Sequence, residues 1–437
     1  MSKEPNFEAF EDWLVREPAG RWLHPFELDK ELNAQQKSIV EKNAKLLLDR
    51  AAWRAHVQAF EEQLALIKDE DERSQTRAMF EIRFDRHTFP DHQANFSRFP
   101  FPCSVSFDRV TFGEGAVWLN GATFADGNIS FRLATFGDGH VSLIGSTFSG
   151  GAVSFNGSTF GDGYVLFQNI KLAETSIYFE DIDVGGNFFV RDIIFRKEAN
   201  FQRASVKGTA DFSGNTFHEV PNFLDTNFAR PPEVAGMEVP PPEMKVNKAL
   251  KVAKNIPAYN IAKYKEDAAK YRQLKKMALA ANDHEKGGEF FAYEMRAKRG
   301  REKGSIEWYE LLANWLYFKL SDFGQSYLRP LVCLGISLAA FIVPYAWMVC
   351  SFLKKSDAFY FALAHSWRNF TPLTNSLFRF STRPEDHPSG YDKIFHDLAH
   401  DDGPVDLLIN IGIFQNFIGL ILLFLLLLGL RNKFRLK

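Results

Sequence analysis

Two histidines in the carboxyl-terminal third of the chain have the spacing of metal ligands. His396 and His400 lie in the segment HDLAH, and on a helix this separation places both imidazoles on one face, where they could bind a metal ion. The glutamate that follows the first histidine in zinc proteases is missing, and no third ligand is singled out. We therefore interpret the stretch as a polar loop without a metal ion. The same stretch also holds Asp386, His387, Asp397, Asp401 and Asp402.

Acidic residues flanked by glycine recur earlier in the chain and could suggest calcium binding. They form Gly-Glu-Gly at 113–115 and Gly-Asp-Gly at 137–139 and 161–163. A calcium ion takes about six to eight oxygen ligands, which is more than these turns supply. Glycine allows a chain to turn with positive φ, and turn chemistry is enough to explain the pattern. We expect no cofactor here, and nothing in the sequence resembles an enzyme active site.

Four polar residues interrupt an apolar stretch near the carboxyl terminus: Asp406, Asn410, Gln415 and Asn416. Spacings of four to six residues place them roughly on one stripe of a helix. Polar side chains inside a membrane span face partners or water, so the stripe predicts either helix–helix hydrogen bonds, in a hairpin or a homo-oligomer, or the lining of a pore. The nearby segment 356–373 could form a re-entrant or interfacial helix, but no potassium-filter motif follows it.

Two segments are apolar enough to cross a membrane. The first lies within 327–353, where a run of 23 residues carries no charge, and the second occupies 405–430. Basic residues precede the first span and follow the second in the tail at 431–437. The positive-inside rule then places both chain ends in the cytoplasm and the loop at 354–404 outside. We expect a multi-pass protein whose partners include membrane lipid.

A repeat organises the chain before these spans. Thr-Phe pairs recur with a period of twelve from 111 to 160, and the steps between apolar positions alternate between five and seven residues. A short period kept over so many residues is typical of a solenoid, in which each coil is stable only when stacked on its neighbours. Coils of about 22–24 residues predict about five or six coils over 107–228. The expected core rings are Phe107, Phe112, Phe124, Phe131, Phe136, Phe148, Phe155, Phe160, Phe167, Phe179, Phe201, Phe212 and Phe217.

The Ala-Thr-Phe and Ser-Thr-Phe pentads, with phenylalanine at the centre, resemble the pentapeptide-repeat family. The segments 99–107, 284–299, 320–331 and 424–437 resemble the membrane-bound members of that family from bacteria. This resemblance implies a right-handed quadrilateral β-helix on the cytoplasmic side of a bacterial inner (plasma) membrane, but it implies no known activity. Phenylalanine in place of leucine and two-residue insertions at alternate pentads depart from the family pattern.

The fold class expected for the whole chain is mixed, with a β-solenoid flanked by helical segments and followed by two transmembrane helices. A helical amino-terminal region is expected at 1–98 and the solenoid at 99–228. Two proline clusters at 229–257 indicate an extended linker. Residues 258–326 indicate a helical adaptor, with two helices broken near residues 282–284.

Charge and cysteine content narrow the function. The formal net charge is −2, and between 101 and 190 nine acidic residues meet three basic ones, so neither nucleic-acid binding nor mimicry of DNA is expected. Cys103, Cys333 and Cys350 have no paired short spacing, which excludes a disulfide framework and a cysteine-based zinc site. We expect a membrane-anchored, non-enzymatic scaffold that presents the solenoid to an unknown protein partner. The alternative is a small two-span channel or membrane-permeability effector regulated by the cytoplasmic repeat domain.

Overall fold

The structure is a computed structural model that describes residues 5–16, 31–91, 94–246, 260–264, 266–298, 308–370, 398 and 405–434. The chain divides into two compact units, residues 1–301 and 302–437, and each is described by itself. Apart from Leu398, the histidine-bearing segment at 386–402 lies outside the described residues, as does the part of the basic tail beyond Phe434.

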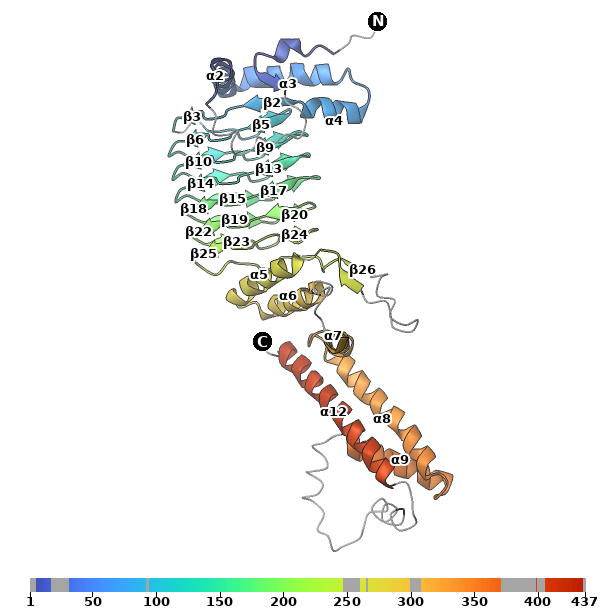
Figure 1. The fold of residues 1–437 in the computed structure, drawn as a ribbon. Coiled ribbons are helices and arrows are strands. Elements are labelled where there is room, and N and C mark those ends of the chain that lie inside the picture. Colours follow the sequence, from blue (N-terminus) through green and yellow to red (C-terminus); the bar gives the residue numbers. More distant parts are fainter. Residues whose placement is uncertain are drawn as a thin grey trace. The chain divides into compact units, whose positions relative to one another are not determined.

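The first unit contains a parallel β-solenoid of about six turns, whose short strands line up as four faces (Figure 1). The first face holds β2 (Phe80–Arg83), β5 (Ser104–Ser106), β9 (Ile129–Ser130), β13 (Ala152–Ser154), β17 (Ser176–Tyr178) and β21 (Ala199–Asn200). The second holds β3 (Thr88–Phe89), β6 (Thr111–Phe112), β10 (Thr135–Phe136), β14 (Thr159–Phe160), β18 (Asp183–Val184), β22 (Ser205–Val206) and β25 (Asn227–Phe228).

The other two faces follow the same order along the chain. The third face holds β7 (Val117–Trp118), β11 (Val141–Ser142), β15 (Val165–Gln168), β19 (Phe188–Arg191) and β23 (Ala210–Asp211). The fourth holds β4 (Pro100–Phe101), β8 (Thr123–Phe124), β12 (Thr147–Phe148) and β16 (Lys171–Leu172), and the pair β20 (Ile194–Phe195) and β24 (Thr216–Phe217) continues the same place in later coils. Thus each coil from β5 to β24 contributes one strand to each face, and the first coil has only the bridge of Asn95 to Trp118 on the third.

Stacked phenylalanine rings fill the solenoid. Neighbouring rings of the longest stack have centroids 4.6–5.3 Å apart and planes within 12° of each other, close to the spacing of paired strands. The strand ladder therefore sets the distance at which the rings meet. All thirteen expected core rings are at most 3 % exposed. The longest stack consists of Phe84, Phe107, Phe131, Phe155, Phe179, Phe201 and Phe223.

The Gly-Asp-Gly turns differ from the expected positive-φ turns. None of their glycines is among the positive-φ residues, which occur at other corners such as Gly145 and Gly157. Successive coils instead approach each other closely at this corner. A Cβ added to Gly139 would lie 2.3 Å from the carbonyl oxygen of Gly115, and one on Gly163 would lie 2.2 Å from that of Gly139. Glycine is required there because the backbones stack without room for a side chain.

Helices cover the amino-terminal end of the solenoid (Figure 1). The buried Trp53 indole packs against the rings of Phe84 and Phe101 and donates its N–H to the carbonyl oxygen of Pro100 at 2.7 Å. Strand β1 pairs antiparallel with β2, which closes the exposed edge of the first face. The covering elements are η1 (Glu8–Phe10), β1 (Leu14–Arg16), α2 (Ala34–Leu48), α3 (Arg50–Leu64) and α4 (Glu70–Ala78).

The solenoid begins within the region that was expected to be helical, 1–98. Strand β2 starts at Phe80, and Thr88-Phe89 pairs with Thr111-Phe112. The step from Thr88 to Thr111 is one residue shorter than the step from Thr111 to Thr135. That single missing residue breaks the strict period of twelve, so the Thr-Phe repeat does not predict the first coil.

The solenoid also extends past 228, into the segment expected to be a linker. Asp211 forms a parallel bridge with Glu233 on the third face, and Val234 and Met237 are fully buried. Proline is tolerated in this last, partial coil because an edge strand need not donate every backbone N–H. Strands β26 (Met244–Val246) and β27 (Asn260–Ala262) then form an antiparallel pair, and residues 247–259 lie outside the description.

A helical hairpin packs on the other end of the solenoid core. It consists of α5 (Asp267–Ala280) and α6 (His284–Ala297), and the Tyr271 hydroxyl donates to the carbonyl oxygen of Pro240 at 2.6 Å. The buried Glu294 forms ion pairs of 2.7–2.9 Å with three cations, Arg272, Lys275 and Lys298. Burial alone would raise the pKa of Glu294, but these cations lower the pKa to about 2. The hairpin is therefore held by a carboxylate that stays ionised.

The second unit consists of helices. Two of them, α8 and α12, are long and apolar enough to cross a membrane over Leu328–Val349 and Val405–Asn432. A further helix, α9, lies inside the expected loop at 354–404 and packs against both. The described helices are α7 (Trp308–Ser321), α8 (Leu328–Val349), α9 (Lys355–Phe370) and α12 (Val405–Phe434).

Truncating one ring of a stack should destabilise the solenoid. Phe136 is 2 % exposed and lies 4.8 Å from Phe112 and 4.5 Å from Phe160, so Phe136→Ala leaves a cavity between two rings. We expect the free energy of unfolding in urea to fall by about 3–5 kcal/mol. The exposed neighbour Thr135 serves as the control, and Thr135→Ala should change the free energy by less than about 0.5 kcal/mol. Equal effects of the two substitutions would contradict the stacked core.

Candidate functional site

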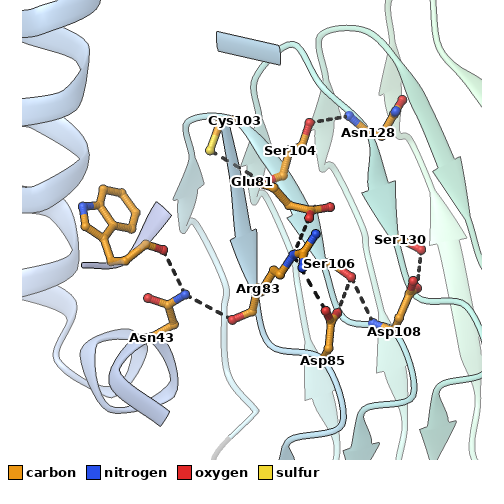
Figure 2. Close-up of polar contacts among 11 residues, drawn as sticks. Asn43, Glu81, Arg83, Asp85, Cys103, Ser104, Ser106, Asp108, Asn128 and Ser130 are labelled. Carbon is orange, nitrogen blue, oxygen red and sulfur yellow. Dashed lines mark hydrogen bonds and ion pairs between the residues drawn. The ribbon is translucent and has the colours of Figure 1, made fainter. Parts of the chain in front are cut away.

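Besides the Glu294 ion pairs, buried polar side chains form a cluster in each unit. The first lies at the amino-terminal end of the solenoid, where Arg83, Asp85, Ser106, Asp108 and Ser130 form a column across successive coils (Figure 2). Repeat position explains the column. Each aspartate follows a ring of the longest stack by one residue, and each serine precedes such a ring by one residue. Strand alternation therefore turns them away from the rings.

Hydrogen bonds join the column from one coil to the next. Ser106 donates its hydroxyl to Asp85, and Ser130 donates its hydroxyl to Asp108. Asp108 also accepts the backbone N–H of Arg132 at 3.0 Å. At the top of the column, Arg83 donates to Glu81 at 2.7 Å and lies 4.0 Å from Asp85 (Figure 2). The carboxylates thus bind protein groups of the next coil.

The surroundings of the two aspartates alter their proton affinity. Burial, together with the neighbouring Asp108 and Glu81, raises the pKa of Asp85 to about 8, against the smaller lowering effects of Ser106 and Arg83. Burial also raises the pKa of Asp108. Such a pair of carboxyl groups is found in some active sites. Here Asp85 is 6 % exposed and Asp108 is 4 % exposed, so a substrate would reach them only if the coils opened.

In later coils the residue at the same repeat position also joins one coil to the next. Asn156 follows its ring by one residue, as Asp85 and Asp108 do, and its side chain accepts the backbone N–H of Glu180 at 3.1 Å. Because an amide at this position accepts the same kind of hydrogen bond as the carboxylates, the column serves to join successive coils. Asp85 and Asp108 are not identified as site residues from the sequence, because their common position in the repeat is visible only when the repeat is aligned from Phe80.

A polar pocket of about 410 Å³ lies between α4 and the solenoid corner beside the first face. Its carboxylates are Asp126 and Glu174. Asp126 accepts a hydrogen bond from the Ser74 hydroxyl at 3.2 Å, and Glu174 forms an ion pair with Lys197 at 3.0 Å. Among the described residues, no group of three or more histidine, cysteine, aspartate or glutamate side chains is arranged to hold a metal ion.

The second polar cluster lies among α8, α9 and α12. Gln415 is 0 % exposed and accepts a hydrogen bond from the Tyr345 hydroxyl at 2.8 Å. Its amide donates to the backbone oxygen of Ser366 at 3.1 Å and to the Ser366 hydroxyl at 2.8 Å, and that hydroxyl donates to the carbonyl oxygen of Leu338 at 2.9 Å. One side chain of α12 therefore joins both other helices.

The helices approach closely beside this cluster. Asn416 donates its amide to Asn369 of α9 at 3.5 Å. A Cβ added to Gly412 would lie 2.8 Å from the Asn369 amide nitrogen, so glycine at 412 leaves room for the end of the Asn369 side chain between α9 and α12. The polar contact and the small residue act together to hold α9 against α12.

The predicted polar stripe is divided by the structure. Gln415 and Asn416 face α9, whereas Asp406 and Asn410 are exposed. At about 100° per residue, position 415 lies almost opposite position 406 on a helix, so one stripe cannot contain them all. The expectation of a single stripe was therefore wrong, and the half that is buried makes helix–helix hydrogen bonds.

The outside of this unit is apolar. Val343 and Trp347 of α8 are 70 % and 77 % exposed, and Ile413 and Phe417 of α12 are each 62 % exposed. A groove of about 570 Å³ between α7, α8 and α12 is also lined mainly by apolar side chains, among them Leu425. Along α8 and α12 the unit therefore exposes mainly apolar side chains, while Gln415 and Ser366 are buried.

A buried glutamine with three partners should stabilise the helical unit. In Gln415→Leu the Tyr345 and Ser366 groups lose their partner, so we expect the free energy of unfolding in mixed micelles to fall by about 1–2 kcal/mol. The exposed Asn410 lies on the same helix, and Asn410→Leu should leave that free energy unchanged. If both substitutions had the same effect, the hydrogen bonds of Gln415 would not stabilise the unit.

The buried aspartate of the column should make solenoid stability depend on pH. The pKa of Asp85 rises from 3.8 to about 8 on folding, so the folded chain binds the extra proton between these values and loses stability as the pH rises through this window. Asp85→Asn keeps the acceptor for Ser106, and its stability relative to the parent chain should increase from pH 5 to pH 8, as measured by hydrogen exchange of the first coils.

Asp181 provides the control for this experiment. Arg203 donates to Asp181 and lowers its pKa, so this carboxylate is ionised in both folded and unfolded chains at pH 5 and pH 8. Asp181→Asn should therefore change stability equally at the two pH values. An effect of Asp85→Asn that is the same at pH 5 and pH 8 would show that Asp85 is ionised throughout.

Comparison with protein-family models, with curated proteins and with solved structures finds no match to this chain.

Proposed function

We propose that the chain is a non-enzymatic scaffold, anchored in a membrane by its second unit, that presents its solenoid to a protein partner. The observation that carries the proposal is the opposite polarity of the two units. The solenoid buries phenylalanine rings and exposes threonines such as Thr111 and Thr135, whereas the helical unit buries Gln415 and Ser366 and exposes aromatic and aliphatic side chains.

The polarity of the helical unit favours a lipid surrounding. In water, exposed apolar side chains at this density would drive association, whereas in a bilayer they contact acyl chains at no cost. Polar groups behave in the opposite way, because lipid offers them no hydrogen bonds and they must find partners within the protein. Gln415 has such partners on two neighbouring helices. Two helices of sufficient length and hydropathy support the same conclusion.

Helix α9 then is a third membrane-embedded segment. Its Ser366 hydroxyl reaches the carbonyl oxygen of Leu338, which lies near the middle of α8, so α9 turns back toward the centre of the span. The outer side of α9 exposes Phe359, Tyr360 and Trp367, and its inner side buries Ala358, Phe361, Ala362, His365 and Ser366. This arrangement favours the re-entrant interpretation of residues 356–373 over an interfacial helix.

The solenoid has the properties of a scaffold. Stacked rings fill its interior, so a ligand has no internal space to enter, and the buried carboxylates are bonded to the next coil. Helices pack on the cores of both end coils, which prevents end-to-end pairing of strands between molecules. A partner would therefore bind on the sides, where short strands hold outward-facing side chains in fixed register.

The repeat and its architecture support membership of the pentapeptide-repeat proteins, and specifically of those that bacteria carry in the inner membrane. The phenylalanine-centred pentads of this chain imply four faces, each with a strand of about two residues per coil and a phenylalanine that points inward, and this arrangement is present here. Basic residues at the end of α12, including Arg431, favour a topology with both chain ends in the cytoplasm.

The alternative function, a small channel, has less support from the geometry. A pore lined by the polar residues of α12 needs those residues to face water, but Gln415 is fully buried and bonded to Tyr345 and Ser366. Asp406 and Asn410 remain exposed, near the end of the helix.

Membrane extraction tests the anchor. The full chain should stay in the membrane pellet at high pH and high salt, whereas a chain that ends at residue 301 should be soluble and retain the β-rich circular dichroism of the solenoid. Removal of the apolar helices explains the difference. A truncated chain that still pellets while folded would place the lipid affinity in the first unit.

Conductance in planar bilayers separates the anchor from the channel. The purified full chain should give no discrete openings across voltages, because the polar cluster is filled by its own side chains. Openings that disappear in Gln415→Leu would favour the channel, and they would assign the cluster at Gln415 to the conduction path.

A further inference from the structure

We infer that the third face of the solenoid is the partner-binding surface, and that it binds a protein segment with apolar side chains and adjacent lysines or arginines. This inference rests on the proposed scaffold function and names the surface and the chemistry of the partner. It begins with the outward positions of β7, β11, β15 and β19.

Large apolar side chains occupy outward positions on this face. Val117, Val165 and Phe188 are nearly fully buried, and alternation along the strands therefore points the next residues, Trp118, Leu166 and Phe189, outward. Strand register places the three in one column, with Ser142 between Trp118 and Leu166. Each is partly exposed. The face thus presents Trp118, Leu166 and Phe189 toward solvent, whereas Ser142, between the first two, is fully buried.

The second face shows that the fold does not require such residues. Its equivalent outward positions in successive coils hold Thr111, Thr135 and Thr159, all of which are exposed. Both faces have parallel strands over an apolar interior, although β15 and β19 of the third face are four residues long and β6, β10 and β14 of the second face are two. Because threonine satisfies the fold on one face, aromatic and aliphatic side chains on the other are not explained by stability, and exposed apolar groups on a rigid surface favour binding.

Aromatic side chains extend the column toward the corner between the second and third faces. The rings of His140 and Tyr164 stack with centroids 4.9 Å apart, and the rings of Tyr164 and Phe189 lie 6.0 Å apart and nearly parallel. Tyr164 is 45 % exposed. Arg191 lies over the Phe189 ring at 4.7 Å and pairs with Asp211. These rigid amphipathic rings lose little entropy on binding, as is common in interface hot spots.

A row of carboxylates borders this surface. Glu114, Asp138 and Asp162 lie at the corner on successive coils, and all three are exposed. The backbone N–H of Asp138 donates to Glu114 at 3.0 Å, and that of Asp162 donates to Asp138 at 3.2 Å. The coils therefore hold the carboxylates in line, one coil apart, and the negative charges lie along one side of the apolar column.

The negative charge beside the column distinguishes between the kinds of partner that its apolar side chains would attract. A second copy of this chain would bring its own carboxylates to the surface, and anionic lipid headgroups or nucleic-acid phosphates would be repelled by them. A protein segment with lysine or arginine beside apolar side chains is complementary to both parts of the surface. We therefore assign the surface to such a segment.

Photo-crosslinking in the membranes of cells that make the full chain tests the assignment. p-Benzoyl-phenylalanine replaces Tyr164 on the third face or Thr159 on the second face, and both positions are exposed in the same coil. The Tyr164 position should give a protein adduct about tenfold stronger than the Thr159 position, corresponding to about 1.4 kcal/mol. Mass spectrometry of the adduct should identify a peptide with lysine or arginine next to apolar residues.

The double change Asp138→Asn and Asp162→Asn tests the charge. The amide oxygen at position 138 can still accept the backbone N–H of residue 162, so the coils should keep their thermal unfolding midpoint while the Tyr164 adduct decreases about tenfold. Asp225 is an exposed carboxylate at another corner, and Asp225→Asn should leave the adduct unchanged. An adduct that persists in the double variant would overturn the role of the carboxylates.

Other results separate this inference from the scaffold function. An adduct to a second copy of the chain or to lipid would overturn the assigned partner. A protein adduct from the second face that exceeds the one from the third would overturn the surface but leave the scaffold. If probes placed on all four faces gave no protein adduct, both the surface and the scaffold would be overturned.

Discussion

Stacking of phenylalanine rings at the spacing of paired strands is the interaction on which the first unit depends. The strands are about two residues long, but backbone hydrogen bonds between coils continue through the corners, as from the N–H of Leu143 to the carbonyl oxygen of Leu166. The rings fill the interior that this ladder encloses, and their burial adds to the stability. Ring and strand spacings agree because each ring is attached to the ladder that sets its height. This agreement constrains the rest of the solenoid: small residues must accompany the rings, glycine must stand where backbones touch at Gly139 and Gly163, and both ends need a cover.

The same chain meets two opposite demands on polar groups. In the solenoid, buried Asp85 and Asp108 bind the next coil, and a water-facing exterior carries threonine and charge. In the helical unit, Gln415 performs a similar joining role between helices, but the exterior is apolar. Both cases follow one principle, that a polar group removed from water requires a partner. The two units differ in the polarity of their exteriors, and that polarity indicates whether water or lipid surrounds each unit.

Much of the fold is predictable from the sequence because the repeat exposes inward positions directly. Phe131 and Phe155 are identified by spacing alone, and so are the two long apolar helices. The ends of the solenoid are not predictable in this way, since a coil shortened by one residue hides Thr88-Phe89. The glycines at 139 and 163 are visible, but their cause is contact between coils, which spacing cannot reveal. The polar positions of α12 are also visible, whereas their division between α9 and the exterior depends on how the helices pack.

Inward and outward positions of a solenoid are subject to different constraints. Inward positions are fixed by ring stacking, and a change there affects every neighbouring coil. Outward positions contact mainly their own ladder, so the fold accepts threonine at 135 and leucine at 166, both in parallel ladders. Binding by such a molecule is therefore determined by its outward columns. A column of apolar residues, where another face has polar residues at the outward positions, is the best indication of a binding surface. Trp118, Leu166 and Phe189 form such a column here, and the carboxylates beside them restrict which partner can use it.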